Sequence, residues 1–114
     1  MKLLLTYIFL TLSCAGTEHT QYGIASWYGR ENRISSTGKK LTHDKPALAH
    51  KTYPIGSYVK VTDIKSKKSV TAIVEDRGPY IKSRVVDLNS VAAKQLNIIS
   101  SGLCRVKVEL LKKN

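Results

Sequence analysis

The chain has 114 residues, which is enough for one domain with its own hydrophobic core. Lys and Arg outnumber Asp and Glu by 19 to 8, and the formal net charge of +11 favours anionic partners. Of the two cysteines, Cys14 and Cys104, only Cys104 lies in the predicted domain. One thiol cannot form an internal disulfide, so the composition excludes a fold that depends on disulfides.

The first residues have the order of a secretory signal. Lys2 precedes the apolar run LLLTYIFLTL, and the small residues SCAG follow it. The run is too short to cross a bilayer permanently. We predict a signal peptide at residues 1–15, a polar tether at 16–21 and a single folded domain at 22–112.

Cys14 stands where lipoprotein signals carry their acylated cysteine. The protein is therefore predicted to be exported to the periplasm or cell envelope and anchored to a membrane by lipid. The alternative is cleavage after Ala15, which removes Cys14 with the signal and leaves a secreted protein without an anchor.

Export also narrows the choice of partner. Nucleic acid is the usual first candidate for a basic chain, but an exported protein does not normally meet it. Acidic lipids, surface polysaccharides and the carboxylates of cell-wall peptides are better candidates, and the alternative is a solvated basic face with no dedicated partner. His19, His43 and His50 are scattered, without ligand spacing, so we expect no metal and no cofactor.

From Gly23 onward the pattern predicts short strands separated by turns. The expected strands are residues 23–29, 57–64, 69–76, 83–88 and 104–111. The one helical pattern covers residues 89–99, with Asn89 or Ser90 as its cap. Its buried side is expected to consist of Val91, Ala92, Leu96 and Ile99.

The stretch at residues 30–56 has few strand signals, and loops of that length are usually functional or mobile. In the last strand Cys104 shares the parity of Val106 and Val108, so it is expected to be a small buried side chain. Several short strands with one short helix predict an all-β barrel.

The stretch VEDRGPYIKSRVVDL, residues 74–88, holds the best candidate for chemistry. Asp76 shares one parity with the apolar residues before it in the strand, which predicts a carboxylate on the inward face at the mouth of the barrel. Partial burial there favours the protonated carboxyl that a general acid needs, whereas Arg77 favours the charged form. The alternative is that Asp76 and Arg77 only fasten a tight loop.

Four other residues each have more than one interpretation. Asp87 either serves the site or accepts backbone hydrogen bonds at the helix start, and its position favours the second role. His50 is equally consistent with a proton carrier, a ligand-positioning donor and a structural histidine. Trp27 and Tyr28 either pack in the core, which is the default, or offer an aromatic platform to a sugar ring.

Several segments, in the same order, resemble the rare lipoprotein A family. They are GIASWYG, ALAHKTYPIGSYVKVTD, VEDRGPYIKSRVVDLNSVAAKQL and RVKVELL, within residues 22–111. The resemblance implies a six-stranded double-psi β-barrel with one short helix, exported in bacteria, often lipid-anchored and acting on peptidoglycan. We expect a monomer. Family members with enzymatic activity are lytic transglycosylases that prefer glycan strands stripped of their peptides.

The resemblance also assigns residues. The Asp of the family's DRGP loop matches Asp76, and the His of its AHKT motif matches His50. A family Glu that precedes this His by eleven residues falls on Lys39, which has the opposite charge. If that Glu is the proton donor, the protein is a barrel that binds peptidoglycan without cleaving it. If the Asp is the donor, Lys39 alters substrate preference and activity remains.

Between these two hypotheses we expect the enzyme, which cleaves the bond between N-acetylmuramic acid and N-acetylglucosamine. The hydroxymethyl oxygen of the muramic acid attacks its own anomeric carbon and closes a 1,6-anhydro ring, so effective molarity replaces a second carboxylate. Asp76 would donate and then accept a proton, and His50 would position the sugar or share that proton. The predicted substrate-binding residues are Arg77, Lys39, Tyr28, Trp27 and Asp87.

Overall fold

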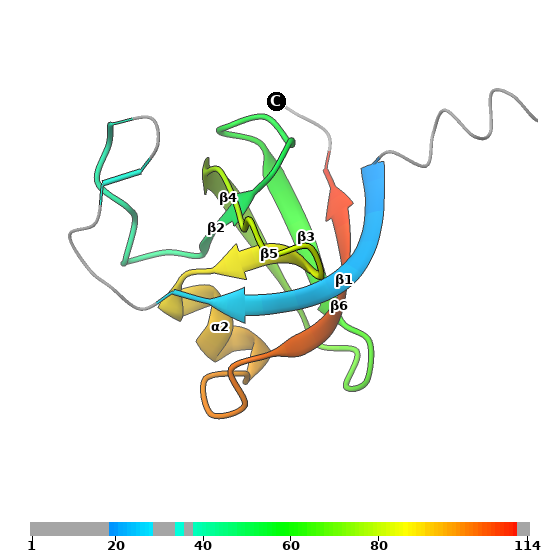
Figure 1. Cartoon of the computed structure of the whole chain (residues 1–114). Helices are drawn as coiled ribbons and strands as arrows, with labels where there is room; N and C mark the ends of the chain where they lie inside the picture. Colours follow the sequence, from blue (N-terminus) through cyan, green and yellow to red (C-terminus); the bar gives the residue numbers. More distant parts are fainter. Residues whose placement is uncertain (1–18, 29–33, 36–37, 112–114) are drawn as a thin grey trace, which may run out of the picture.

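A computed structural model describes residues 19–28, 34–35 and 38–111, and its strands close into a barrel (Figure 1). The order of strands around the barrel is β1-β5-β2-β4-β3-β6, with β6 paired back to β1. The elements are β1 (Thr20–Trp27), β2 (Ala47–His50), β3 (Tyr58–Asp63), β4 (Ser69–Asp76), β5 (Arg84–Leu88), α2 (Ser90–Leu96) and β6 (Cys104–Leu110). The predicted signal peptide and Cys14 lie outside the described residues.

Five of the strands coincide with predicted ones. In β3, β4, β5 and β6 the apolar residues alternate, and one face of each strand is buried. The buried residues of β3, β4 and β6 are Val59, Val61, Val70, Ala72, Val74, Val106 and Val108. All of them belong to one hydrophobic core. Cys104 is half-buried and packs against this core, so it is less enclosed than expected.

The first strand begins earlier than predicted. β1 starts at Thr20, and its first two residues, Thr20 and Gln21, pair with Glu109 and Val108 of β6. Residues 20 and 21 of the predicted tether therefore belong to the barrel. Their polar side chains gave no apolar alternation, so only the pairing with β6 identifies them as strand.

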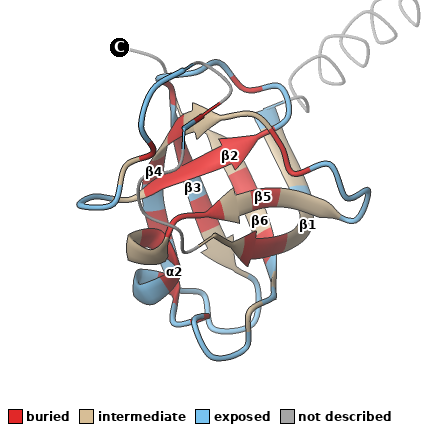
Figure 2. Cartoon of the chain, turned by 60° about the vertical axis from the view of Figure 1, so that its left-hand side comes forward, coloured by how far each residue is buried: buried red, intermediate tan, exposed pale blue. Residues whose placement is uncertain are grey.

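The sequence did not predict β2, which lies in the barrel wall between β5 and β4. All four of its residues are buried, and Figure 2 shows the strand red along its whole length. A strand covered on both faces has no polar alternation, and alanine is depleted in strands. Residues 47–50 of the predicted loop are thus a central strand.

The predicted helix is present but shorter. α2 ends at Leu96 because Asn97 takes a left-handed conformation at its C-cap, with φ of 62°. Its buried residues are Ala92, Ala93 and Leu96. The prediction that Ile99 is buried was wrong, because helical periodicity stops before that residue; Ile99 is 37% exposed and Ile98 is buried instead. No helix in the described part of the chain is long and apolar enough to span a membrane.

Asn89 joins the helix to the segment that leads into β2. Its Oδ1 accepts a hydrogen bond from the Ala92 N–H at 2.9 Å, which caps α2. Its Nδ2 donates to the carbonyl oxygens of Thr42 at 3.1 Å and Lys45 at 2.7 Å. Because the side chain is buried, these bonds hold the approach to β2 in place.

Candidate active site

The barrel register places four residues in one row across neighbouring strands. Asp87 of β5 pairs with Ser26 of β1 on one side and with Ala49 of β2 on the other. Ala49 in turn pairs with Asp76 at the end of β4. Residues that pair in register point to the same face of a sheet, so two carboxylates flank a small methyl group.

This row lies on the face of the wall opposite the core. Leu88 and Leu48, which precede or follow row residues by one position, belong to the core, so Asp87 and Ala49 point outward. Asp76 joins them because the register shifts: Leu48 pairs with Val74 and Ala49 with Asp76, which leaves Glu75 as an extra residue. The prediction that Asp76 lies on the inward face at the barrel mouth was therefore wrong.

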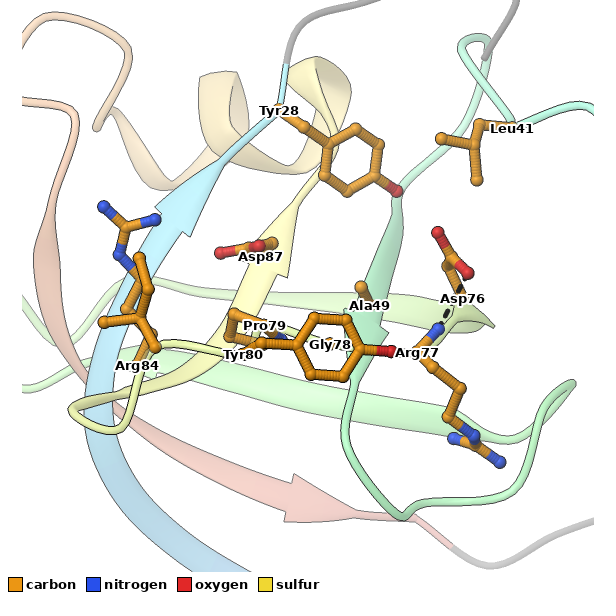
Figure 3. Close-up of a pocket in the computed structure, with 11 residues that line it drawn as sticks. Tyr28, Leu41, Ala49, Asp76, Arg77, Gly78, Pro79, Tyr80, Arg84 and Asp87 are labelled. Carbon is orange, nitrogen blue, oxygen red and sulfur yellow. Dashed lines mark hydrogen bonds between the residues drawn. The ribbon is translucent and has the colours of Figure 1, made fainter. Parts of the chain in front are cut away.

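A hollow opens over the row, which we call the wall pocket (Figure 3). It is lined by Tyr28, Leu41, Ala49, Asp76, Arg77, Gly78, Pro79, Tyr80, Ile81, Arg84 and Asp87, and its volume is about 170 Å³. In Figure 3 Asp87 and Asp76 lie on either side of Ala49, and the rings of Tyr28 and Tyr80 lie above and below them. The pocket therefore combines two carboxylates with two aromatic rings.

Asp76 is half-buried and faces this pocket. Its Oδ1 accepts a hydrogen bond from the Arg77 N–H at 2.8 Å, which fixes the carboxyl against the start of the loop. The loop turns sharply at Gly78, whose φ of 119° favours glycine. The carboxyl is thus held in one orientation at the edge of an accessible hollow.

The Arg77 guanidinium points away from the wall pocket in Figure 3. Its Nη1 donates to the carbonyl oxygen of Tyr53 at 2.6 Å and to that of His50 at 3.2 Å. Arg77 therefore fastens the loop after β4 to the chain at the end of β2 and just after it. This agrees with the interpretation in which Arg77 holds a tight loop.

Asp87 does not serve the helix start. Its carboxylate accepts a short hydrogen bond from the hydroxyl of Ser26, its neighbour in the row, and Asn89 provides the cap. Asp87 lies three residues before α2, which favours a role at the helix start. Its side chain instead points out of the barrel wall, and Asn89 caps the helix. Asp87 is thus available to the wall pocket.

Tyr28 is held by Glu75, a residue that the sequence reasoning missed. The Tyr28 hydroxyl donates to Glu75 Oε2 at 2.7 Å, and the Thr42 N–H donates to Glu75 Oε1 at 2.8 Å. Burial first, and then the hydrogen bond to Glu75, raise the pKa of Tyr28 well above its ordinary value. The hydroxyl therefore stays protonated as a donor, and the ring is fixed at the pocket.

Three predicted site residues do not line the wall pocket. Trp27 is half-buried and packs against the hydrophobic core, the first of its two interpretations. His50 is 1% exposed and lies on the core side of β2. Lys39 is exposed and lines a separate hollow, the lysine hollow, made by Lys39, Lys40, Thr42, Lys45, Ile55, Gly56, Ile73, Val74 and Glu75. The structure thus brings together Asp76, Arg77, Tyr28 and Asp87.

The described His, Cys, Asp and Glu residues form no group of three that could hold a metal ion. Tyr80, which the sequence reasoning did not select, lines the wall pocket and is 84% exposed. The signal that could have identified Tyr80 is its position, an aromatic residue directly after the Gly-Pro pair of the loop that begins at Asp76.

The barrel matches a known protein family. A family model described as lytic transglycolase matches residues 20–108, the whole barrel apart from the last residues of β6. The chain belongs to the lytic transglycolase family. Relatives that carry the name RlpA, 44% and 46% identical to this chain, confirm the resemblance to rare lipoprotein A proteins.

Two relatives in this family carry the name endolytic peptidoglycan transglycosylase RlpA. The protein from Neisseria meningitidis is 44% identical over 94 residues, which cover 81% of this chain and 39% of the relative. The protein from Pseudomonas aeruginosa is 46% identical over 89 residues, which cover 76% of this chain and 26% of the relative. The chain thus spans well under half the length of either relative.

Solved structures agree on the fold at low sequence identity. The Streptomyces papain inhibitor superposes with a TM-score of 0.66 at 16% identity, covering 82% of this chain and 94% of the inhibitor. A mutant expansin of Clavibacter michiganensis in complex with cellohexaose has a TM-score of 0.67 at 16% identity, covering 82% of this chain and 50% of the expansin. The six-stranded double-psi β-barrel expected for the family is confirmed.

Proposed function

We propose that this protein is an endolytic peptidoglycan transglycosylase, which cleaves the bond between N-acetylmuramic acid and N-acetylglucosamine in peptide-stripped glycan strands. The observation that carries the proposal is a half-buried carboxyl, Asp76, held at the edge of an open pocket on the outer barrel wall. Relatives named for this activity support it. An open hollow on a barrel wall suits a polymer, because a long chain can lie across it.

One acid is sufficient for the proposed chemistry. Protonated Asp76 donates its proton to the glycosidic oxygen as the bond from that oxygen to C1 of muramic acid breaks. The C6 hydroxyl oxygen of the same sugar forms the new bond to C1, and the carboxylate of Asp76 accepts the hydroxyl proton. Because the nucleophile belongs to the substrate, no water or second carboxylate is required. Asp87 lies on the far side of β2 from Asp76, with Ala49 between them, and is left to bind sugar hydroxyls.

The proposed substrate sets the location. A protein that acts on peptidoglycan works in the periplasm or cell envelope, and the signal-like residues 1–15 agree with export. We propose that it acts there as a monomer, with acylation of Cys14 as the means of anchoring.

Digestion of peptide-stripped glycan prepared from purified sacculi, followed by mass analysis of the products, tests the function. We expect glycan fragments with 1,6-anhydro ends, which differ by one water from hydrolysis products. New reducing ends on muramic acid would indicate hydrolysis and overturn the proposal. Co-sedimentation with sacculi and no cleavage of the stripped glycan would instead support a binding barrel, the function that the positive charge of Lys39 favours.

Tyr80→Ala is expected to raise the KM for glycan by about three- to tenfold with little change in kcat, because stacking on a ring stabilises bound substrate and transition state alike. Tyr80 lines the wall pocket, and its side chain is almost fully exposed. Tyr80→Phe keeps the ring and serves as the matched control. Steady-state digestion of denuded glycan measures both constants. Equal effects of the two substitutions, or an unchanged KM in Tyr80→Ala, would contradict this role.

Lys39→Gln is expected to weaken binding of denuded glycan by no more than about fivefold, the range of a solvent-exposed ion pair. Glu75 lines the lysine hollow and accepts a hydrogen bond from Tyr28, which lines the wall pocket, so Lys39 can meet the lactyl carboxylate of a neighbouring sugar. Lys60→Gln, at an exposed position of β3 outside both hollows, is the control. The effect of Lys39→Gln should shrink as salt is added, and an equal loss in both variants would mean that only the net charge matters.

A further inference from the structure

His50 is the centre of a buried hydrogen-bond network on the side of β2 away from the wall pocket. Its Nδ1 accepts hydrogen bonds from two backbone groups, the Thr52 N–H at 3.0 Å and the Tyr53 N–H at 2.9 Å. Its Nε2 lies 2.9 Å from Oε1 of Gln21 in β1. The ring also stacks on the Tyr53 ring, with centroids 3.7 Å apart and an interplanar angle of 6°.

These contacts define the protonation state of the imidazole. Nδ1 receives two N–H groups, so it carries no proton, and Nε2 therefore bears the hydrogen that it donates to Gln21. Burial first, and then the positive charges of Arg77 and Lys51, lower the pKa of His50 to about 4. Tyr53, which also faces the ring, stays neutral because burial raises its pKa. His50 is thus a neutral ring with every polar atom engaged.

The network leads directly to the carboxyl of the wall pocket. The turn whose N–H groups His50 accepts presents its carbonyl oxygens to the Arg77 guanidinium, through His50 O and Tyr53 O. The backbone N–H of the same Arg77 donates to Asp76 Oδ1. A chain of contacts therefore runs from His50 through the turn at 50–53 and Arg77 to Asp76.

The strand geometry argues against direct participation of His50 in chemistry at the wall pocket. His50 and Ala49 are consecutive in β2, and alternation places their side chains on opposite faces of the wall. Ala49 lines the wall pocket, whereas His50 does not and is 1% exposed. The imidazole is therefore separated by the barrel wall from a sugar bound in the wall pocket.

We propose that His50 is a positioning residue, which holds the turn at residues 50–53 and thereby Arg77 and Asp76 in their working geometry, and exchanges no proton with the substrate. The proposal rests on the proposed transglycosylase function for its catalytic readout. Its structural part, the support of Arg77 by His50, stands on the hydrogen bonds alone.

The catalytic test compares two substitutions. Asn at position 50 offers an oxygen near the place of Nδ1 and can accept the N–H groups of the turn, as Asx turns do. We expect His50→Asn to lose no more than about threefold in release of anhydro-ended products, and His50→Ala to lose about ten- to a hundredfold, because buried N–H groups then lack acceptors. A proton carrier predicts that both variants are equally inactive, and that result would overturn the proposal. Unchanged activity in His50→Ala would also overturn it.

The link through Arg77 is tested by a double-mutant cycle with Arg77→Met. If His50 acts through Arg77, the loss in His50→Ala with Arg77→Met should match the larger single loss. Losses that multiply would show that the two residues act independently and would contradict the proposal.

A structural readout separates this inference from the proposed function. Amide hydrogen exchange at Thr52, Tyr53 and Arg77 should be slow in the wild type and in His50→Asn, and much faster in His50→Ala. Nitrogen-15 spectra of the His50 ring in the wild-type protein should show the Nε2–H form at neutral pH. If the wild type cleaves no peptidoglycan, the proposed function fails and these measurements still decide the role of His50. Equal protection in all three proteins, or an imidazolium, would refute it.

Discussion

Asp76→Asn is expected to lower the release of anhydro-ended products by about 100- to 10,000-fold, the range that general acid catalysis contributes. The amide keeps the size of the carboxyl, and its oxygen can still accept the Arg77 N–H that now reaches Oδ1. It has no acidic proton to give to the departing sugar oxygen. Mass analysis of digests of peptide-stripped glycan over time, beside co-sedimentation with sacculi, separates the loss of cleavage from a loss of binding.

Asp87→Asn is the matched control, because it removes the other carboxylate of the same pocket. The Ser26 hydroxyl can donate to an amide oxygen as it does to the carboxylate, so the row should keep its geometry. A much smaller loss than in Asp76→Asn is expected. Equal product yields from the wild type and Asp76→Asn would remove Asp76 from the role of acid. Similarly large losses in both variants would show that the two carboxylates act as a pair.

The free energy of unfolding is expected to fall by roughly 3 kcal/mol more in the wild type than in His50→Asn as the pH is lowered from 7 to below 4. The pKa of His50 is lowered from 6.5 to about 4 in the folded protein, first by burial. Between these values the unfolded chain binds a proton that the folded protein excludes. The stabilisation is complete above pH 6.5 and is lost as the pH falls to 4. Urea titrations at several pH values measure it.

The comparison with His50→Asn isolates the imidazole. The two proteins differ only at residue 50, and the Asn side chain has no group that titrates in this range. The difference between the proteins therefore reports His50 alone. Parallel pH profiles for the two proteins would show that the ring is not kept neutral by the fold.

Much of the barrel follows from local pattern. The alternating valines of β3, β4 and β6 predict those strands, since a strand with one buried face repeats every two residues. The polar cap and apolar spacing around Asn89 predict α2. The motif DRGP, with its carboxylate and turn residues, identifies Asp76 as a candidate before any geometry is known. Each of these signals lies within a few residues of the chain.

The features that the sequence did not predict, β2 and the role of Glu75, depend on contacts between segments that are distant in the chain. β2 has no alternation because neighbouring structure covers both of its faces, and it becomes a strand through its partners β5 and β4. The role of Glu75 is invisible in the sequence because its partners, Tyr28 and Thr42, are 47 and 33 residues away. No local pattern contains such contacts.

The sequence by itself determined which residues form most strands and the helix, and that a carboxylate ends the strand at 69–76. Only the tertiary structure decided which face that carboxylate occupies. The extra residue Glu75, seen in the register of β4 against β2, turns Asp76 from the core side to the outer wall, and the alternation of β2 leaves His50 behind that wall. Side-chain direction follows from the register between strands, and register is a property of the pair of strands, which neither strand's own pattern specifies.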